Sequence, residues 1–131
     1  MILRSFRVKT KSRLESVDLT DRVKEVISDV GEGVAHIMVK HTTCALVINE
    51  AERGLMRDYL EWATRLIPPD AEFHHNEVDN NGYAHLLASI FGNSRCVPVL
   101  KGQLVLGTWQ RVILLEFDGP REREVMIAVT S

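Results

Sequence analysis

The stretch that decides the fold reads QLVLGTWQRVILLEF and runs from residue 103 to residue 117. Residues 112–117 form a run of apolar residues of the length of one strand, which predicts a buried β-strand. Residues 103–106 alternate polar and apolar side chains and predict a second strand. Between the two lie a glycine, a hydroxyl, an indole and a carboxamide, which a pure core strand would not carry. Residues 107–110 therefore indicate a functional site.

Similar patterns continue on both sides of this stretch. Apolar and β-branched residues predict further strands at residues 2–10, 34–39, 44–48, 96–99 and 125–129. Apolar residues at helical spacing predict helices over residues 23–30, 55–66 and 84–91, which Gly31, Pro68 and Gly92 would end. The short links between strands favour an α+β fold over a doubly wound sheet. We expect one domain, residues 1–131, built as a mixed or antiparallel β-sandwich or distorted barrel with two to three helices.

The composition limits the classes of partner. The 131 residues include 16 Lys and Arg against 18 Asp and Glu, and no stretch concentrates basic side chains. This balance argues against nucleic acid as a partner. No apolar run approaches the roughly 18 residues of a membrane span, and the N-terminus lacks the apolar segment of a signal peptide. We expect a cytoplasmic protein without a membrane partner. Cys44 and Cys96 lie on apolar runs and are expected to be buried thiols.

Three histidines lie in segments that also carry hydroxyl or amide side chains: His41, His75 and His85. Neutral imidazole is the commonest transition-metal ligand in proteins, and a catalytic zinc site typically takes three protein ligands. The three could ligate one divalent metal, zinc or magnesium; alternatively, each hydrogen-bonds a neighbouring carbonyl. His74 is ambiguous because it adjoins His75, and His36 is expected to be structural because it lies inside a strand.

Hydroxyl, amide and guanidinium groups provide candidate ligands for a phosphate. Thr42 and Thr43 lie at a strand end, where hydroxyl and N–H groups suit a phosphate oxygen. If the strand continues through 107–110, alternation places Thr108 and Gln110 on one face and turns Trp109 away, into packing. Arg121 either binds a phosphate or pairs with a carboxylate of the adjacent turn.

The order and spacing of several blocks resemble the YjbQ-like family, the secondary thiamine-phosphate synthase family. The matching blocks are His41-Thr42-Thr43, Ile48-Asn49-Glu50, His75, Asn81, Ala84-His85-Leu86, Val97-Pro98-Val99, Gly102, Leu106-Gly107-Thr108-Trp109-Gln110 and Glu116-Phe117-Asp118-Gly119-Pro120-Arg121. The resemblance implies a homotrimer with sites near subunit boundaries. It also implies a transferase that joins a pyrimidine pyrophosphate to a thiazole phosphate, as a main or a side activity.

The predicted site combines the residue patterns with this resemblance. Its expected catalytic residues are His41, His75, His85 and Glu50, and its expected substrate-binding residues are Thr42, Thr43, Asn49, Asn81, Thr108, Gln110 and Arg121. The substrate would be small and phosphorylated. Two other functions stay open at this point: a metal-dependent hydrolase whose three histidines hold the ion while Glu50 or Glu116 acts as base, and a non-catalytic binder of a small anion.

Overall fold

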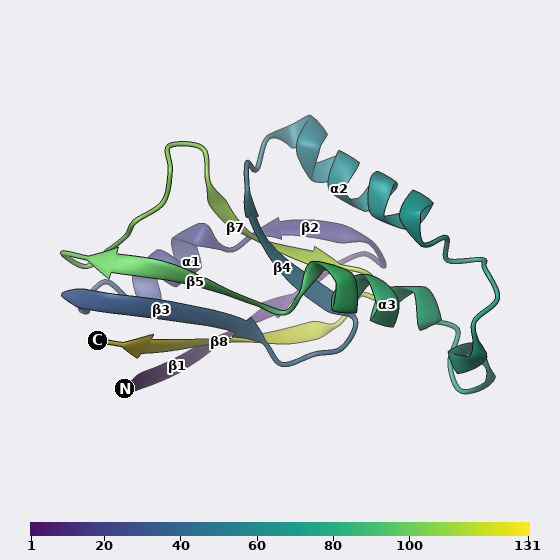
Figure 1. The fold of residues 1–131 in the computed structure, drawn as a ribbon, viewed down its shortest axis with the longest axis horizontal. Helices are drawn as coiled ribbons and strands as arrows, with labels where there is room; N and C mark the ends of the chain where they lie inside the picture. Colours follow the sequence, from purple (N-terminus) through teal and green to yellow (C-terminus); the bar gives the residue numbers. More distant parts are fainter.

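The computed structural model describes all 131 residues and consists of two β-sheets and three α-helices (Figure 1). The strands are β1 (Ile2–Lys9), β2 (Glu15–Asp18), β3 (Glu32–Val39), β4 (Cys44–Asn49), β5 (Ser94–Leu100), β6 (Gln103–Leu104), β7 (Arg111–Glu116) and β8 (Glu122–Thr130). The helices are α1 (Thr20–Val26), α2 (Arg53–Leu66) and α3 (Gly82–Phe91), and the 3₁₀-helix η1 (His74–Glu77) precedes α3.

Every strand pairing in the two sheets is antiparallel. The larger sheet has the order β1-β8-β3-β5-β6, and the smaller one has the order β2-β7-β4. The sheets are curled around each other, and the two chain termini lie close together at one end (Figure 1). The predicted α+β fold, a curled antiparallel sandwich or half-barrel with three helices, is confirmed.

Strand β7 is buried on both faces, which explains its continuous apolar sequence. Val112 and Leu114 pack into the core between the two sheets, which also receives α1. Ile113 and Leu115 point to the opposite face, into a second core that α2 and α3 cover. The molecule therefore has three layers: the larger sheet, the smaller sheet and the helix pair.

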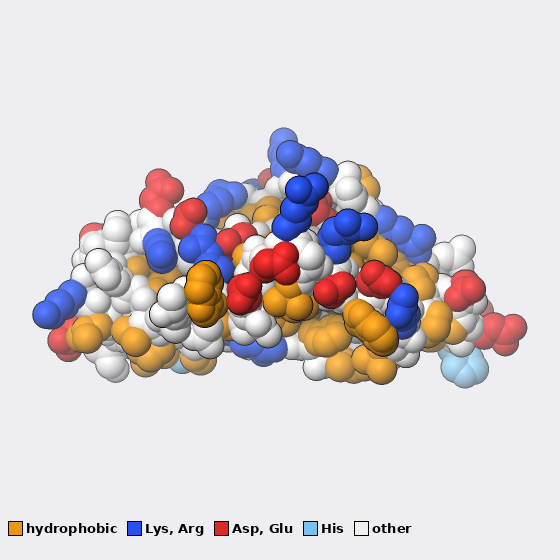
Figure 2. Space-filling model, turned by 90° about the horizontal axis from the view of Figure 1, so that it is seen from above, with side chains coloured by type: hydrophobic (Ala, Val, Ile, Leu, Met, Phe, Trp, Pro, Cys, Tyr) orange, Lys and Arg blue, Asp and Glu red, His pale blue; other side chains and the backbone are white.

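Helix α2 lies on the outside of the third layer (Figure 1). Of its 14 residues only Ala63 is buried, and Trp62 and Leu66 each keep 61% of their surface exposed. Between α2, α3 and the smaller sheet an apolar groove of about 680 Å³ remains open. Figure 2 shows acidic, basic and hydrophobic side chains interspersed on the face that carries α2.

Residues 107–110 do not continue a strand, so the alternation expected for them in that case does not occur. Strand β6 already ends at Leu104, and Gly107 and Gln110 close a turn in which the Gln110 N–H donates to the Gly107 carbonyl at 3.1 Å. The Gln110 side-chain oxygen accepts from the Gly107 N–H at 2.8 Å. Period-two alternation does not apply in a turn, so Trp109 does not pack into a core. It remains 71% exposed.

Smaller features of the structure also differ from the sequence-based expectations. Strand β2 was not expected, and α1 ends at Val26, before Gly31. Helix α2 begins after Glu52, whose carboxylate accepts from the Leu55 N–H at 3.0 Å. Cys44 is buried as expected, but Cys96 is exposed because it lies on the outer face of the larger sheet.

None of the three helices is both long enough and apolar enough to cross a membrane.

Candidate functional site

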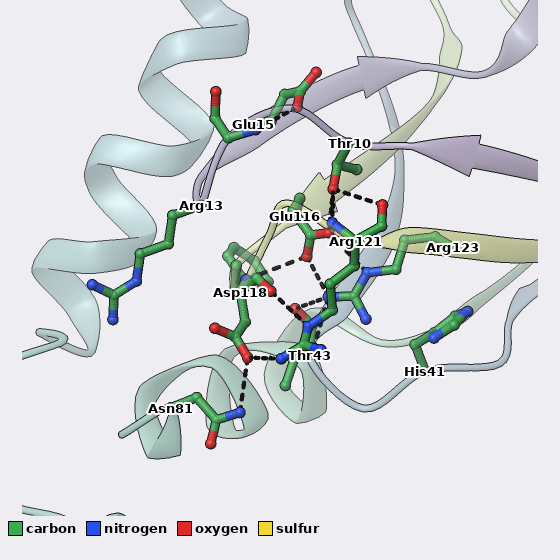
Figure 3. Close-up of polar contacts among 12 residues, drawn as sticks. Thr10, Arg13, Glu15, His41, Thr43, Asn81, Glu116, Asp118, Arg121 and Arg123 are labelled. Atoms are coloured by element: carbon green, nitrogen blue, oxygen red, sulfur yellow. Dashed lines mark hydrogen bonds and ion pairs between the residues drawn. The ribbon is translucent and has the colours of Figure 1, made fainter. Parts of the chain in front are cut away.

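A buried ion pair joins the two sheets at one corner of the molecule (Figure 3). Glu116 ends β7 in the smaller sheet, and Arg123 lies in β8 of the larger sheet. Glu116 is fully buried and Arg123 keeps only 2% of its surface exposed. The Arg123 Nε donates to Glu116 Oε1 at 2.8 Å, and Nη2 donates to the other carboxylate oxygen. The pair is therefore bidentate and closed to solvent.

Neighbouring groups complete the hydrogen bonding of this pair. Thr10 Oγ1 donates to Glu116 Oε1 at 2.8 Å, and Arg123 Nη2 donates to Thr43 Oγ1 at 2.8 Å. Burial by itself lowers the pKa of Arg123, but the hydrogen bonds and charge of Glu116 outweigh burial and raise it above the ordinary value. No buried polar side-chain atom in the chain lacks a partner.

A polar pocket of about 690 Å³ opens beside the ion pair. No hydrophobic side chain lines it, and its cations include Lys40 and Arg121. The lining residues are Lys40, His41, Thr42, Thr43, Asn81, His85, Pro120, Arg121, Glu122 and Arg123. The pocket thus brings together six of the predicted site residues, which come from three separate segments of the chain.

A backbone hydrogen bond fixes the tautomer of His41 at the pocket. Its Nε2 accepts a hydrogen bond from the Glu124 backbone N–H at 2.8 Å, so the neutral ring carries its proton on Nδ1. Burial and the positive charge of Arg123 both lower the pKa of His41. His41 is therefore neutral at pH 7 and can donate a hydrogen bond from Nδ1.

His85 and His75 lie next to each other but have different surroundings. Their rings meet edge-on with centroids 4.5 Å apart. His75 lies outside the pocket lining, and its Nε2 is 2.9 Å from Asn81 Oδ1, an acceptor to which it donates. His85, in the first turn of α3, lines the pocket, and its ring makes no hydrogen bond within the chain. His85 is thus free to contact a ligand, while His75 orients Asn81.

A chain of polar contacts fixes Arg121 at the rim. The Asn81 amide donates to Asp118 Oδ2 at 2.8 Å, and Arg121 Nη2 donates to the same oxygen at 3.0 Å. Burial alone would raise the pKa of Asp118, but the hydrogen bonds from Asn81 and Arg121 lower it, so Asp118 stays ionised. Arg121 also donates from Nε to the Asp118 carbonyl, which leaves Nη1 without a partner in the chain.

The remaining predicted residues lie elsewhere. Glu50 and Thr108 line a separate hollow with Trp109, and Asn49 lines the apolar groove under α2. Gln110 closes its own turn. Thr43 lies at the pocket, but it is buried and its hydroxyl oxygen accepts a hydrogen bond from Arg123. Of the two threonines, only Thr42 is exposed.

The arrangement does not fit a three-histidine metal site. The structure holds no group of three His, Cys, Asp or Glu side chains that could bind one ion. Both His41 and His75 use Nε2 in internal hydrogen bonds. The divalent metal therefore stays a prediction.

Sequence reasoning missed Arg123. The signal was present, because Arg123 precedes Val125, Ile127 and Val129 at a spacing of two, and all three point into the core. A strand residue in this register points inward as well. A buried arginine needs an acidic partner to balance its charge, and Glu116 is that partner.

Comparison with known proteins assigns the family. The family model described as "UPF0047 protein YjbQ-like" matches residues 4–131. The chain belongs to the YjbQ-like (UPF0047) family.

Three members of known sequence or structure illustrate the match. A UPF0047 protein of Archaeoglobus fulgidus is 48% identical over 92% of this chain and 94% of its own. The Bacillus subtilis protein YugU is 36% identical over 96% of this chain and 97% of its own. A crystal structure of a hypothetical protein from Aeropyrum pernix, 46% identical, covers 100% of this chain and 99% of its own with a TM-score of 0.96.

The buried ion pair leads to a stability prediction. Glu116→Gln keeps the shape of the side chain but leaves the Arg123 charge unpaired, which costs about 3–5 kcal/mol for a buried pair. The matched control is Glu61→Gln, because Glu61 pairs with Arg65 at 2.6 Å on the exposed face of α2. The free energy of unfolding of this control variant should fall by less than about 1 kcal/mol, because the pair is exposed to solvent. Urea unfolding measures both, and equal losses would contradict the role assigned to Glu116.

The lowered pKa of His41 leads to a pH prediction. As the pH falls through 6.5, the unfolded chain protonates His41 before the folded chain does, so the unfolded state binds more protons and stability falls. His41→Gln retains an acceptor for the Glu124 N–H and removes this titration. The melting temperature of the variant should therefore fall less steeply below pH 6.5 than that of the wild type. The shifted carboxyls do not interfere, because their stabilisation is lost only at and below about pH 3.8.

The control for this pH series is His74→Gln, which removes an exposed histidine of η1. Its pH profile should follow the wild type. If the melting temperatures of the wild type and of His41→Gln change with pH in the same way, the lowered pKa of His41 is contradicted.

Proposed function

We propose that the polar pocket binds a small phosphorylated metabolite and that the chain is a thiamine-phosphate-synthase-like transferase. The observation that supports this proposal is the lining itself: two imidazoles, an exposed threonine and the cations Lys40 and Arg121 surround a cavity without hydrophobic side chains. The substrates implied by the family resemblance are a pyrimidine pyrophosphate and a thiazole phosphate.

The reaction would displace pyrophosphate from carbon. The thiazole nitrogen attacks the methylene carbon of the pyrimidine substrate, the carbon–oxygen bond breaks, and pyrophosphate leaves with both electrons. Negative charge grows on the leaving oxygen, so donors aimed at that oxygen stabilise the transition state. Arg121 supplies its free Nη1, His41 supplies Nδ1–H, and His85 can give a proton to the departing oxygen.

The hydrolase alternative receives less support from the same contacts. Its candidate base Glu116 is fully buried against Arg123, and its other candidate, Glu50, lines a different hollow. A non-catalytic anion binder would use the same pocket without turnover. We also propose that the protein acts in the cytoplasm.

We further propose a homotrimer with the pockets near subunit boundaries. Support comes from surfaces that a single chain leaves uncovered: the apolar groove under α2 with Trp62 at its rim, and the exposed Trp109 turn. A second copy would remove this apolar area from water. It could also bring Thr108 of one chain toward the pocket of another.

The transferase proposal is tested with two pocket variants. His85→Ala should lower thiamine phosphate formation from the two precursors by about 10²-fold or more, and Arg121→Ala should weaken pyrophosphate binding measured by calorimetry. Both side chains are at least partly exposed, so the melting temperature should change little. The control is His36→Ala, which alters an exposed histidine outside the pocket.

Three outcomes separate the alternatives. Pyrophosphate binding without turnover in the wild type would favour the binder. Phosphate release from either precursor that requires added metal would favour the hydrolase. Unchanged turnover in a destabilised His85→Ala variant would assign His85 to structure and overturn the proposed site.

The trimer proposal is tested by light scattering at micromolar concentration. The expected mass is three times the 14.8 kDa of the chain. Trp62→Glu should reduce this mass because it places a charge in the groove, whereas Val78→Glu, at a residue that is 84% exposed, should not. A stable wild-type monomer would contradict the trimer and the proposal that the pockets lie near subunit boundaries.

A further inference from the structure

A second cluster of reactive side chains lies outside the pocket, on the outer face of the larger sheet. Cys96 of β5 lies directly opposite His36 of β3, and opposite residues of an antiparallel pair share a face. Thr130 of β8 lies opposite Val34, two residues from His36, and therefore belongs to the same face. Three adjacent strands thus carry a thiol, an imidazole and a hydroxyl side by side.

The three side chains form a hydrogen-bonded row. Cys96 Sγ lies 3.2 Å from His36 Nδ1, and His36 Nε2 lies 3.1 Å from Thr130 Oγ1. When Nε2–H donates to the Thr130 hydroxyl oxygen, Nδ1 is left as the acceptor for the thiol proton. After that proton has moved, both ring nitrogens are donors, to the thiolate and to the same hydroxyl oxygen. The row therefore accommodates the proton in either place without rearrangement.

We propose that Cys96, His36 and Thr130 form a thiol-exchange site that reacts with low-molecular-weight disulfides. The Cys96 thiol gives its proton to His36 Nδ1, and the sulfur attacks one sulfur of the disulfide. A new bond forms from Cys96 Sγ to that sulfur, and the original sulfur–sulfur bond breaks. The other half leaves as a thiolate, which takes the proton from His36. The products are a mixed disulfide on Cys96 and one free thiol.

The surroundings favour an uncharged disulfide. The residues that flank the row on this face carry no charge: Val34, Met38, Ser94, Pro98 and Ala128. Cys96 is exposed and a disulfide can approach it from solvent. The other cysteine provides an internal contrast, because Cys44 is buried and burial raises the pKa of its thiol to about 12. The inference does not depend on the transferase proposal, since the row lies outside the polar pocket.

The test follows the reaction of the native full chain with the neutral disulfide dithiodipyridine, which releases a thiopyridone that is detected by its ultraviolet absorbance. One thiol should react rapidly, and mass spectrometry should locate the modification on Cys96. His36→Asn should slow the reaction by about tenfold or more, because the base is lost. Free imidazole in the buffer should restore part of the rate in this variant, which a purely structural effect would not allow.

Control variants keep the test decisive. Cys96→Ser should abolish the rapid phase, and Ser94→Ala, an exposed change on the same face of β5, should leave the rate unchanged. Melting temperatures confirm that each variant is folded. The proposal is overturned if His36→Asn reacts as fast as the wild type, or if Cys96 reacts only after unfolding because another copy covers this face.

Discussion

The ion pair between Glu116 and Arg123 is the constraint on which the rest of the arrangement depends. Two charges removed from water must be paired and fully hydrogen-bonded, or the folded state loses several kcal/mol. To satisfy them, the end of β7, the start of β8, the bend before β4 and the residue after β1 must all meet at one corner. The pocket opens at that corner and is lined by Thr43 and Arg123. The contacts that join the two sheets therefore also position part of the pocket lining.

The layered packing determines which segments reach the pocket. Because β7 is buried on both faces, the smaller sheet lies between the larger sheet and the helix pair. Helix α3 packs on the smaller sheet and projects His85 and Asn81 from its first turn and N-cap. The bend before β4 supplies His41 and Thr42 from the other side. Side chains from distant positions therefore converge on elements that the two cores hold in place.

In and beside the pocket, histidines have different roles because their surroundings differ. His41 is held neutral by burial and by the Arg123 charge, His75 orients Asn81, and His85 alone has an unused ring. His36, on the outer face of the larger sheet and outside the pocket, contacts a thiol. The chemistry available to each imidazole is thus decided by its neighbours.

The sequence by itself determined the strand and helix pattern and most of the pocket. Hydrophobic periodicity depends on local geometry, so the apolar run of β7 and the segments around His41, Asn81 and His85 could be recognised. Only the tertiary structure showed that Arg123 pairs with Glu116, that Trp109 lies exposed on a turn, and that Glu50 and Thr108 face another hollow. Those facts depend on contacts between residues far apart in the chain, and periodicity carries no information about which distant side chains meet.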